Sequence, residues 1–142
     1  MIASAVTLLI LGACESESPT RPYWEEHISW VFSVSLPDTA YVGVEFSVVI
    51  SAYGGFENSR VGDDVVTPIS GGFQITPYDW EYYPSGPKNR ALQTLQHTVP
   101  LTVFQSGSAK VEVQDLHYTH PDGYAVVAIS NEVLVVPANR GR

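Results

Sequence analysis

The chain contains a single cysteine and few positively charged residues. Its 142 residues include seven Lys or Arg against fifteen Asp or Glu, for a formal net charge of −8. One cysteine cannot form a disulfide within the chain, which excludes a disulfide-stabilised scaffold. An acidic chain lacks the cationic surface that neutralises phosphates, so the composition argues against nucleic acid as a partner.

The sequence also lacks the short motifs of common catalytic sites. It has no nucleophile elbow, no phosphate-binding glycine loop and no His-Glu-x-x-His. What it does have is aromatic residues, eight Tyr, five Phe and three Trp, which are typical of a folded chain. We therefore expect a folded protein that is not an enzyme and needs no cofactor.

The N-terminal segment is apolar and short. An uncharged stretch runs from Ile2 to Ala13 and ends at Cys14. It is too short to span a membrane as a helix, which takes about 20 residues, but its length is typical of the apolar part of a signal peptide. The following polar residues, 15–22, cannot bury enough surface to fold and are expected to form a tether.

The four residues at the end of this stretch resemble the lipobox of bacterial lipoproteins: Leu11, Gly12, Ala13 and Cys14. The resemblance implies cleavage between Ala13 and Cys14, a diacylglyceryl thioether on the Cys14 sulfur and acylation of the new amine. Each buried methylene contributes about 0.8 kcal/mol, so several acyl chains hold a protein at a membrane. Without this processing, Cys14 would be a free thiol at the end of an ordinary apolar segment.

The same resemblance implies a location. The membrane becomes a partner through the acyl chains on Cys14, and the protein is expected in the bacterial cell envelope. Glu15 stands where inner-membrane lipoproteins commonly have Asp, which favours the outer membrane.

Alternation of apolar and polar residues predicts β-strands. Two segments show it most clearly, with these residues expected to face inward: Ile28, Trp30, Phe32, Val34 and Leu36; then Val44, Phe46, Val48, Ile50 and Ala52. Five further strands are expected at 65–69, 73–78, 92–104, 109–114 and 124–136. Pro77 and Pro100 predict an edge, bend or bulge, and residues 130–132 predict a bulge.

Seven short strands separated by Gly and Pro turns are typical of a two-sheet antiparallel sandwich. Segments 36–48 and 104–113 resemble strand joins of bacterial immunoglobulin-like domains, although the core cysteines of antibody domains are absent. The resemblance implies an all-β, seven-stranded antiparallel immunoglobulin-like sandwich. The expected organisation is a signal peptide (1–13), a lipid-anchored tether (14–27), the sandwich domain (28–137) and a C-terminal tail (138–142).

Four aromatic residues lie within six positions: Tyr78, Trp80, Tyr82 and Tyr83. In an extended strand, the first three share one face, while Asp79 and Glu81 point the other way. Such an aromatic platform is suited to stacking on sugar rings or anchoring a protein partner. Alternatively, these rings cover the open end of the sandwich and join its core.

Four potential metal ligands lie within eight positions: Asp115, His117, His120 and Asp122. Imidazole and carboxylate suit zinc, but a site needs ligands that converge to about 2 Å from the metal. Alternatively, this is a solvated hairpin in which Asp122 serves a Pro-Asp-Gly turn. Elsewhere, His27 and His97 have no partner identifiable from sequence, and Asp63 and Asp64 are expected in a solvated turn.

Two classes of function remain. The first is a membrane-anchored structural or binding module with a protein or glycan partner, the glycan-binding version using Tyr78, Trp80 and Tyr82. The second is a small metal-dependent enzyme that uses Asp115, His117 and His120.

Overall fold

The computed structural model describes residues 21–55, 58–86, 92–119 and 123–138, which form nine strands and no helix. The strands are β1 (Tyr23–Ile28), β2 (Trp30–Ser35), β3 (Thr39–Tyr41), β4 (Glu45–Gly54), β5 (Arg60–Ile69), β6 (Gly72–Tyr83), β7 (Gln93–Thr102), β8 (Gly107–Thr119) and β9 (Gly123–Val136). The predicted all-β class is confirmed. The predicted count of seven was too low, because β1 and β3 were not anticipated.

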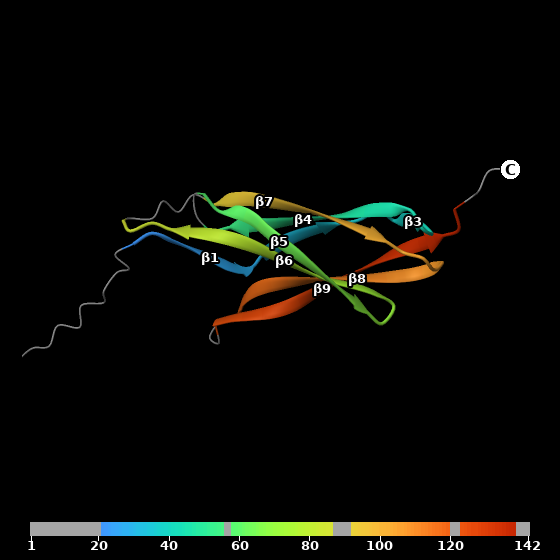
Figure 1. Ribbon diagram of the computed structural model, residues 1–142. Coiled ribbons are helices and arrows are strands. Elements are labelled where there is room, and N and C mark those ends of the chain that lie inside the picture. Colours follow the sequence, from blue (N-terminus) through green and yellow to red (C-terminus); the bar gives the residue numbers. More distant parts are fainter. Residues whose placement is uncertain (1–20, 56–57, 87–91, 120–122, 139–142) are drawn as a thin grey trace, which may run out of the picture.

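The strands form two layers (Figure 1). A three-stranded sheet has the order β2-β4-β7, and a six-stranded sheet has the order β1-β6-β8-β9-β3 with β5 also paired to β6. The pairings β6–β8 and β3–β9 are parallel. The six-stranded sheet is therefore mixed, and the expectation of a purely antiparallel sandwich was wrong. Between β6 and β8 the chain crosses to the other sheet as β7, which allows both strands to run in the same direction.

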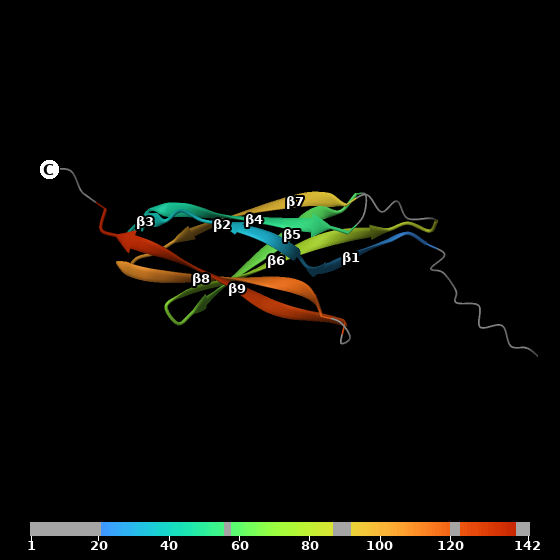
Figure 2. The same cartoon turned by 180° about the vertical axis from the view of Figure 1, so that it is seen from behind.

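The chain changes sheets at Ser29, between β1 and β2. Its amide donates a hydrogen bond to the carbonyl of Pro77 (2.9 Å), and its carbonyl accepts one from the amide of Leu116 (3.1 Å). The backbone of Ser29 thus stays bonded to the six-stranded sheet while the next strand joins β4. Figure 2 shows β2 beside β4 from behind.

A β-bulge in β2 reverses the predicted orientation of its first residues. The register with β4 shifts between Val31 and Ser33. Val31 is buried, whereas Trp30 and Phe32, both predicted to face inward, are 38% and 45% exposed. The extra residue of a bulge moves side chains to the opposite face, which simple alternation does not anticipate.

The main core lies between the two sheets. Its buried side chains are Val31, Val48, Ile50, Val99 and Leu101 from the three-stranded sheet, and Ile75, Val111 and Val113 from the other. A second cluster contains Ala40, Ala109, Val133 and Val135. The predicted inward positions in β4 are confirmed, except that Val44 precedes β4 and is exposed. The predicted bulge at 130–132 was wrong, because the β8–β9 register is continuous there.

Two prolines and one glycine fix local geometry. Pro100 lies in β7, an edge strand, and Pro77 lies in β6 opposite the point where β5 is bulged, as predicted. At Gly72, where β6 begins beside β8, an added Cβ would collide with the backbone of Lys110. A glycine is therefore required for the two strands to approach this closely.

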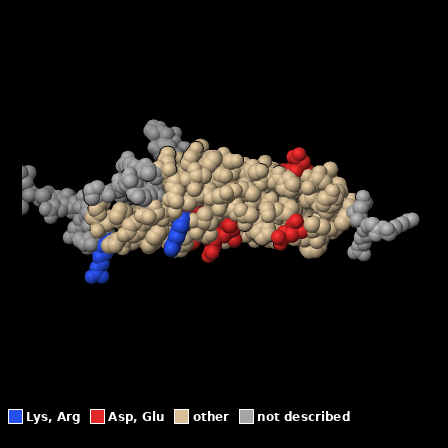
Figure 3. Space-filling model, turned by 90° about the horizontal axis from the view of Figure 1, so that it is seen from above, with Lys and Arg blue, Asp and Glu red and all other residues tan. Residues whose placement is uncertain are grey.

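The sandwich is elongated, and its first strand begins at the opposite end from the last residues of β9 (Figure 1). Residues 23–27, assigned to the tether by sequence, form most of β1. The face seen in Figure 3 carries few charged side chains among the described residues. Charge on that face therefore does not indicate a binding site.

Candidate functional site

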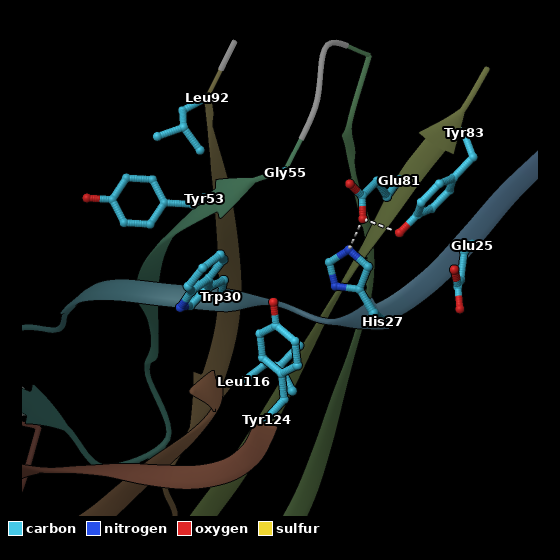
Figure 4. A pocket seen from close by; sticks show the side chains of 10 residues that line it. All are labelled: Glu25, His27, Trp30, Tyr53, Gly55, Glu81, Tyr83, Leu92, Leu116 and Tyr124. Atoms are coloured by element: carbon cyan, nitrogen blue, oxygen red, sulfur yellow. Dashed lines mark hydrogen bonds and ion pairs between the residues drawn. The ribbon is translucent and has the colours of Figure 1, made fainter. Parts of the chain in front are cut away.

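A cavity of about 790 Å³ opens at the end of the sandwich where β1 begins (Figure 4). Its lining residues are Glu25, His27, Trp30, Tyr53, Gly55, Glu81, Tyr83, Leu92, Leu116 and Tyr124. Both sheets and the end of the β8–β9 hairpin contribute to it. The cavity has the size and mixed lining typical of small-molecule sites.

One wall is polar and comes from the pairing of β1 with β6. The register places Glu25 opposite Glu81 and Tyr23 opposite Tyr83, so these side chains share the inner face. The rings of Tyr23 and Tyr83 are stacked, with centroids 4.8 Å apart and planes within 4°. This stack limits the positions open to Tyr83 at the edge of the cavity.

The carboxylate of Glu81 is held in place by its neighbours. It accepts a hydrogen bond from the hydroxyl of Tyr83 at 2.8 Å, and its Oε2 lies 3.5 Å from Nε2 of His27 (Figure 4). The residue is only 7% exposed. On the other side, a Cβ added to Gly55 would lie 2.7 Å from Oε1 of Glu81, so the glycine makes room for this carboxylate.

The electrostatics of the polar wall are negative. Burial, the hydrogen bond to Glu81 and the charges of Glu81 and Glu25 together raise the pKa of Tyr83 well above its ordinary value. Each of these causes disfavours a negative charge on the phenol oxygen. The cavity therefore disfavours anions at this position.

The opposite wall is aromatic and apolar. Trp30, Tyr53 and Leu92 lie across the cavity from Glu81 and Tyr83, and Tyr124 lies beside Trp30 (Figure 4). Trp30 and Tyr124 meet edge to face, with centroids 6.3 Å apart and an interplanar angle of 88°. The bulge and sheet change that turn Trp30 out of the core thus place it at this cavity.

A second polar cluster lies deeper, between the sheets. Nδ1 of His97 is 2.8 Å from Oδ1 of Asp64, and Nε2 is 3.0 Å from Oδ1 of Asp79. The hydroxyl of Ser29 lies 3.3 Å from the same Nε2. Burial opposes protonation of His97, but the hydrogen bonds to both carboxylates and their charges outweigh it and raise the pKa to about 9. His97 is therefore a buried imidazolium with two anionic neighbours.

This cluster contains the residue types of a hydrolase triad, yet its geometry suits a structural role. Ser29 and Asp79 are fully buried and His97 is 1% exposed. Nε2 of His97 faces both the hydroxyl and a carboxylate, so it is not free to accept the serine proton. Ser29 is therefore not presented to a substrate as a nucleophile.

The predicted aromatic platform divides between two faces of β6. Tyr78, Trp80 and Tyr82 alternate with the buried Asp79 and Glu81, so they lie on the outer face of the sheet. Tyr83 lies at the inner cavity instead. The predicted shared face of the first three rings is therefore found, and these three half-buried rings do not join the main core.

Strand β1 extends this outer aromatic face. Trp24 pairs with Tyr82 across the strands, with ring centroids 5.1 Å apart. The guanidinium of Arg60 lies 4.3 Å from the ring centroid of Trp24 and 5.9 Å from that of Trp80. Arg60 therefore covers part of the surface on which a sugar would stack.

The predicted metal ligands are only partly within the described residues. Oδ1 of Asp115 accepts a hydrogen bond from the backbone amide of Val31 at 2.7 Å, which links the two sheets. Nδ1 of His117 lies 3.9 Å from the other carboxylate oxygen of Asp115. His120 and Asp122 lie outside the described residues. In the described ranges, no group of three or more His, Cys, Asp or Glu is placed to hold a metal ion.

The lipobox residues Leu11, Gly12, Ala13 and Cys14 also lie outside the described residues. Within the part that the structure does describe, no helix has the length and apolar character needed to cross a membrane. No protein-family model matches the chain, and neither a curated protein nor a solved structure gives a match. Function must therefore be inferred from the geometry of the sites.

Sequence reasoning did not find the cavity. It placed Glu81 on the face opposite the rings, but it gave His27 no partner, assigned Glu25 to the tether and placed Trp30 in the core. Alternation in residues 23–28 would have put Glu25 and His27 on one face. Only the pairing of β1 with β6 brings that face to Glu81.

Proposed function

We propose that this protein is a lipid-anchored binding module of the bacterial cell envelope, in which an immunoglobulin-like sandwich binds a small ligand in its end cavity. The observation that supports this most strongly is the cavity itself. It combines a fixed carboxylate, a tyrosine hydroxyl and an imidazole on one wall with rings on the other. Convergent polar groups in a largely apolar cleft are the usual composition of a ligand site.

The proposed anchor and the cavity belong to the same end of the domain. Residues 15–22 separate Cys14 from β1, and eight extended residues reach at most about 28 Å. Acyl chains on Cys14 would hold the cavity end of the sandwich near the membrane surface. The ligand would then be captured close to that membrane, for which the lipobox resemblance favours the outer membrane.

The test compares two tryptophans on opposite faces. A library of small polar compounds is screened against the full-length protein by saturation-transfer NMR, and the hits are repeated on Trp30→Ala and Trp80→Ala. Trp30 lines the cavity and Trp80 lies on the outer face. We expect binding to be lost in Trp30→Ala and kept in Trp80→Ala. Hits that behave identically in all three proteins would contradict the proposed site.

The outer aromatic face supports a second candidate, glycan binding. Tyr78, Trp80 and Tyr82 share that face with Trp24, and aromatic rings stack on sugars. Arg60 over Trp24 and Trp80 would have to move for a sugar to stack there. If glycans from a panel bind the parent protein but not Trp80→Ala, the result would favour glycan binding on the outer face over ligand binding in the cavity.

A further inference from the structure

The two glutamates of the cavity stand directly opposite each other on paired strands. Glu25 on β1 is the register partner of Glu81 on β6. Like charges in directly opposed positions destabilise a sheet, and here one carboxylate is also buried. Violations of such local rules tend to occur where function requires them. The pair concentrates negative charge at one wall of the cavity.

No positive side chain of the cavity wall compensates this charge permanently. None of the ten lining residues is Lys or Arg, and His27 is the one imidazole among them. Burial and the hydrogen bond to Glu81 are the main causes of the raised pKa of Tyr83, and the negative charges of Glu81 and Glu25 raise it further. A bound anion would meet these charges unfavourably, and a bound cation would be stabilised by them.

The aromatic wall restricts which cations fit. The negative faces of aromatic rings attract cations, and the gain is largest for weakly hydrated ones such as alkylammonium ions. A hard metal ion instead requires six or more oxygen ligands for calcium, or near-octahedral oxygen geometry for magnesium. No suitable cluster of ligands occurs among the described residues.

From these observations we infer that the ligand of this cavity is a small organic ammonium ion, held between the carboxylates of Glu25 and Glu81 and the rings of Trp30, Tyr53 and Tyr124. This inference rests on the proposed function and specifies its ligand class. Glu81 supplies a fixed charge at the base of the polar wall. Glu25 is exposed and supplies a second charge at the edge of the cavity (Figure 4).

The test uses two compounds of nearly equal shape. Choline carries a quaternary ammonium, and 3,3-dimethylbutan-1-ol replaces its nitrogen with carbon and is neutral. Titration calorimetry of the full-length protein at low salt compares their affinities. We expect choline to bind about tenfold more tightly than the alcohol, because only choline gains the cation–π and carboxylate attraction. Added salt is expected to weaken choline binding.

Two neighbouring glutamates provide a matched pair of variants. Glu25 faces the cavity, whereas Glu26 is opposite Trp80 on the outer face. We expect Glu25→Gln to weaken choline binding roughly threefold, as for loss of an exposed ion pair, and Glu26→Gln to leave it unchanged. Both residues are exposed, so neither change threatens the fold.

The outcomes test the ammonium ligand separately from the cavity as a binding site. Equal affinity for both compounds, abolished in Trp30→Ala, would contradict selection by charge while leaving the cavity as a binding site. No choline binding at millimolar concentration would contradict the ammonium inference, and the compound screen on Trp30→Ala would still decide whether the cavity binds ligands. Weakening by Glu26→Gln equal to that by Glu25→Gln would place choline outside the cavity.

Discussion

Nε2 of His97 lies 3.0 Å from Oδ1 of Asp79, and both side chains are buried between the two sheets. Oδ1 of Asp64 lies 2.8 Å from Nδ1, the other ring nitrogen, and the hydroxyl of Ser29 lies 3.3 Å from Nε2. An unpaired buried charge is strongly destabilising, so this arrangement requires the imidazolium and its carboxylates together. It links β7 to β5 and β6 across the sandwich.

Stability is expected to fall as the pH rises from about 6.5 to about 9. The pKa of His97 is about 9 in the folded protein and about 6.5 in an unfolded chain. The folded state therefore keeps a proton that the unfolded state releases. Protonated His97 therefore contributes up to about 3 kcal/mol to the free energy of unfolding. This contribution is fully present below about pH 6.5 and is lost by about pH 9.

Urea unfolding at pH 6 and pH 9 measures this effect. A His97→Gln variant has no imidazole at this position and is expected to lose much less stability between the two pH values. The same decrease in parent and variant would show that another group is responsible.

Replacing Asp79 with Asn is expected to destabilise the fold by about 3 kcal/mol, because a buried imidazolium loses one of its counter-charges. Oδ2 of Asp79 has no hydrogen-bond partner among the described residues, so the second oxygen offers no compensation. Asp63→Asn is the matched control, since Asp63 is exposed on β5. It is expected to change the free energy of unfolding by less than about 0.5 kcal/mol. Similar losses in both variants, measured in urea, would contradict the structural role of Asp79.

Gly72→Ala is expected to destabilise the protein by about 2 to 3 kcal/mol, because the new methyl group meets the backbone of Lys110 rather than a mobile side chain. Gly86→Ala is the control, since nothing lies within 4 Å of a Cβ there. Thermal unfolding of the two variants checks the difference. Equal melting temperatures would mean that β6 and β8 are not closely paired at Gly72.

Cys14→Ser is expected to move the protein from the membrane fraction to the soluble fraction, because the acyl chains would have no thiol to attach to. Ser16→Ala, two residues away, is expected to remain with the membranes. Fractionation followed by mass spectrometry of the intact protein measures both. An unchanged distribution of Cys14→Ser, or an unmodified N-terminus in the parent, would exclude acylation at this residue.

Sequence alternation predicted the parts of the fold that depend on neighbouring residues. The inward face of β4 followed directly from the period of two, as did the one face that Tyr78, Trp80 and Tyr82 share. It failed where the backbone departs from a regular strand. The bulge after Val31 exposed Trp30, and the sheet change at Ser29 divided one predicted strand into two.

The polar sites depend on contacts between distant segments, which is why they were not predicted. His97 meets Asp64 and Asp79 from 33 and 18 residues away. Asp64 was expected in a solvated turn, but it lies in β5 with its side chain 21% exposed and directed at the imidazole. Alternation shows which face a side chain takes, but it does not show which strand lies opposite.

The central claim, that ligands bind in the end cavity, can be tested with the three tryptophans of the chain. Trp30 lines the cavity, whereas Trp24 and Trp80 lie beside Arg60 on the outer face. Each indole N–H gives its own signal in a nitrogen-correlated NMR spectrum. On addition of choline to the labelled full-length protein, we expect the Trp30 indole signal to shift while those of Trp24 and Trp80 stay in place. Shifts confined to Trp24 and Trp80, with Trp30 unaffected, would contradict the account.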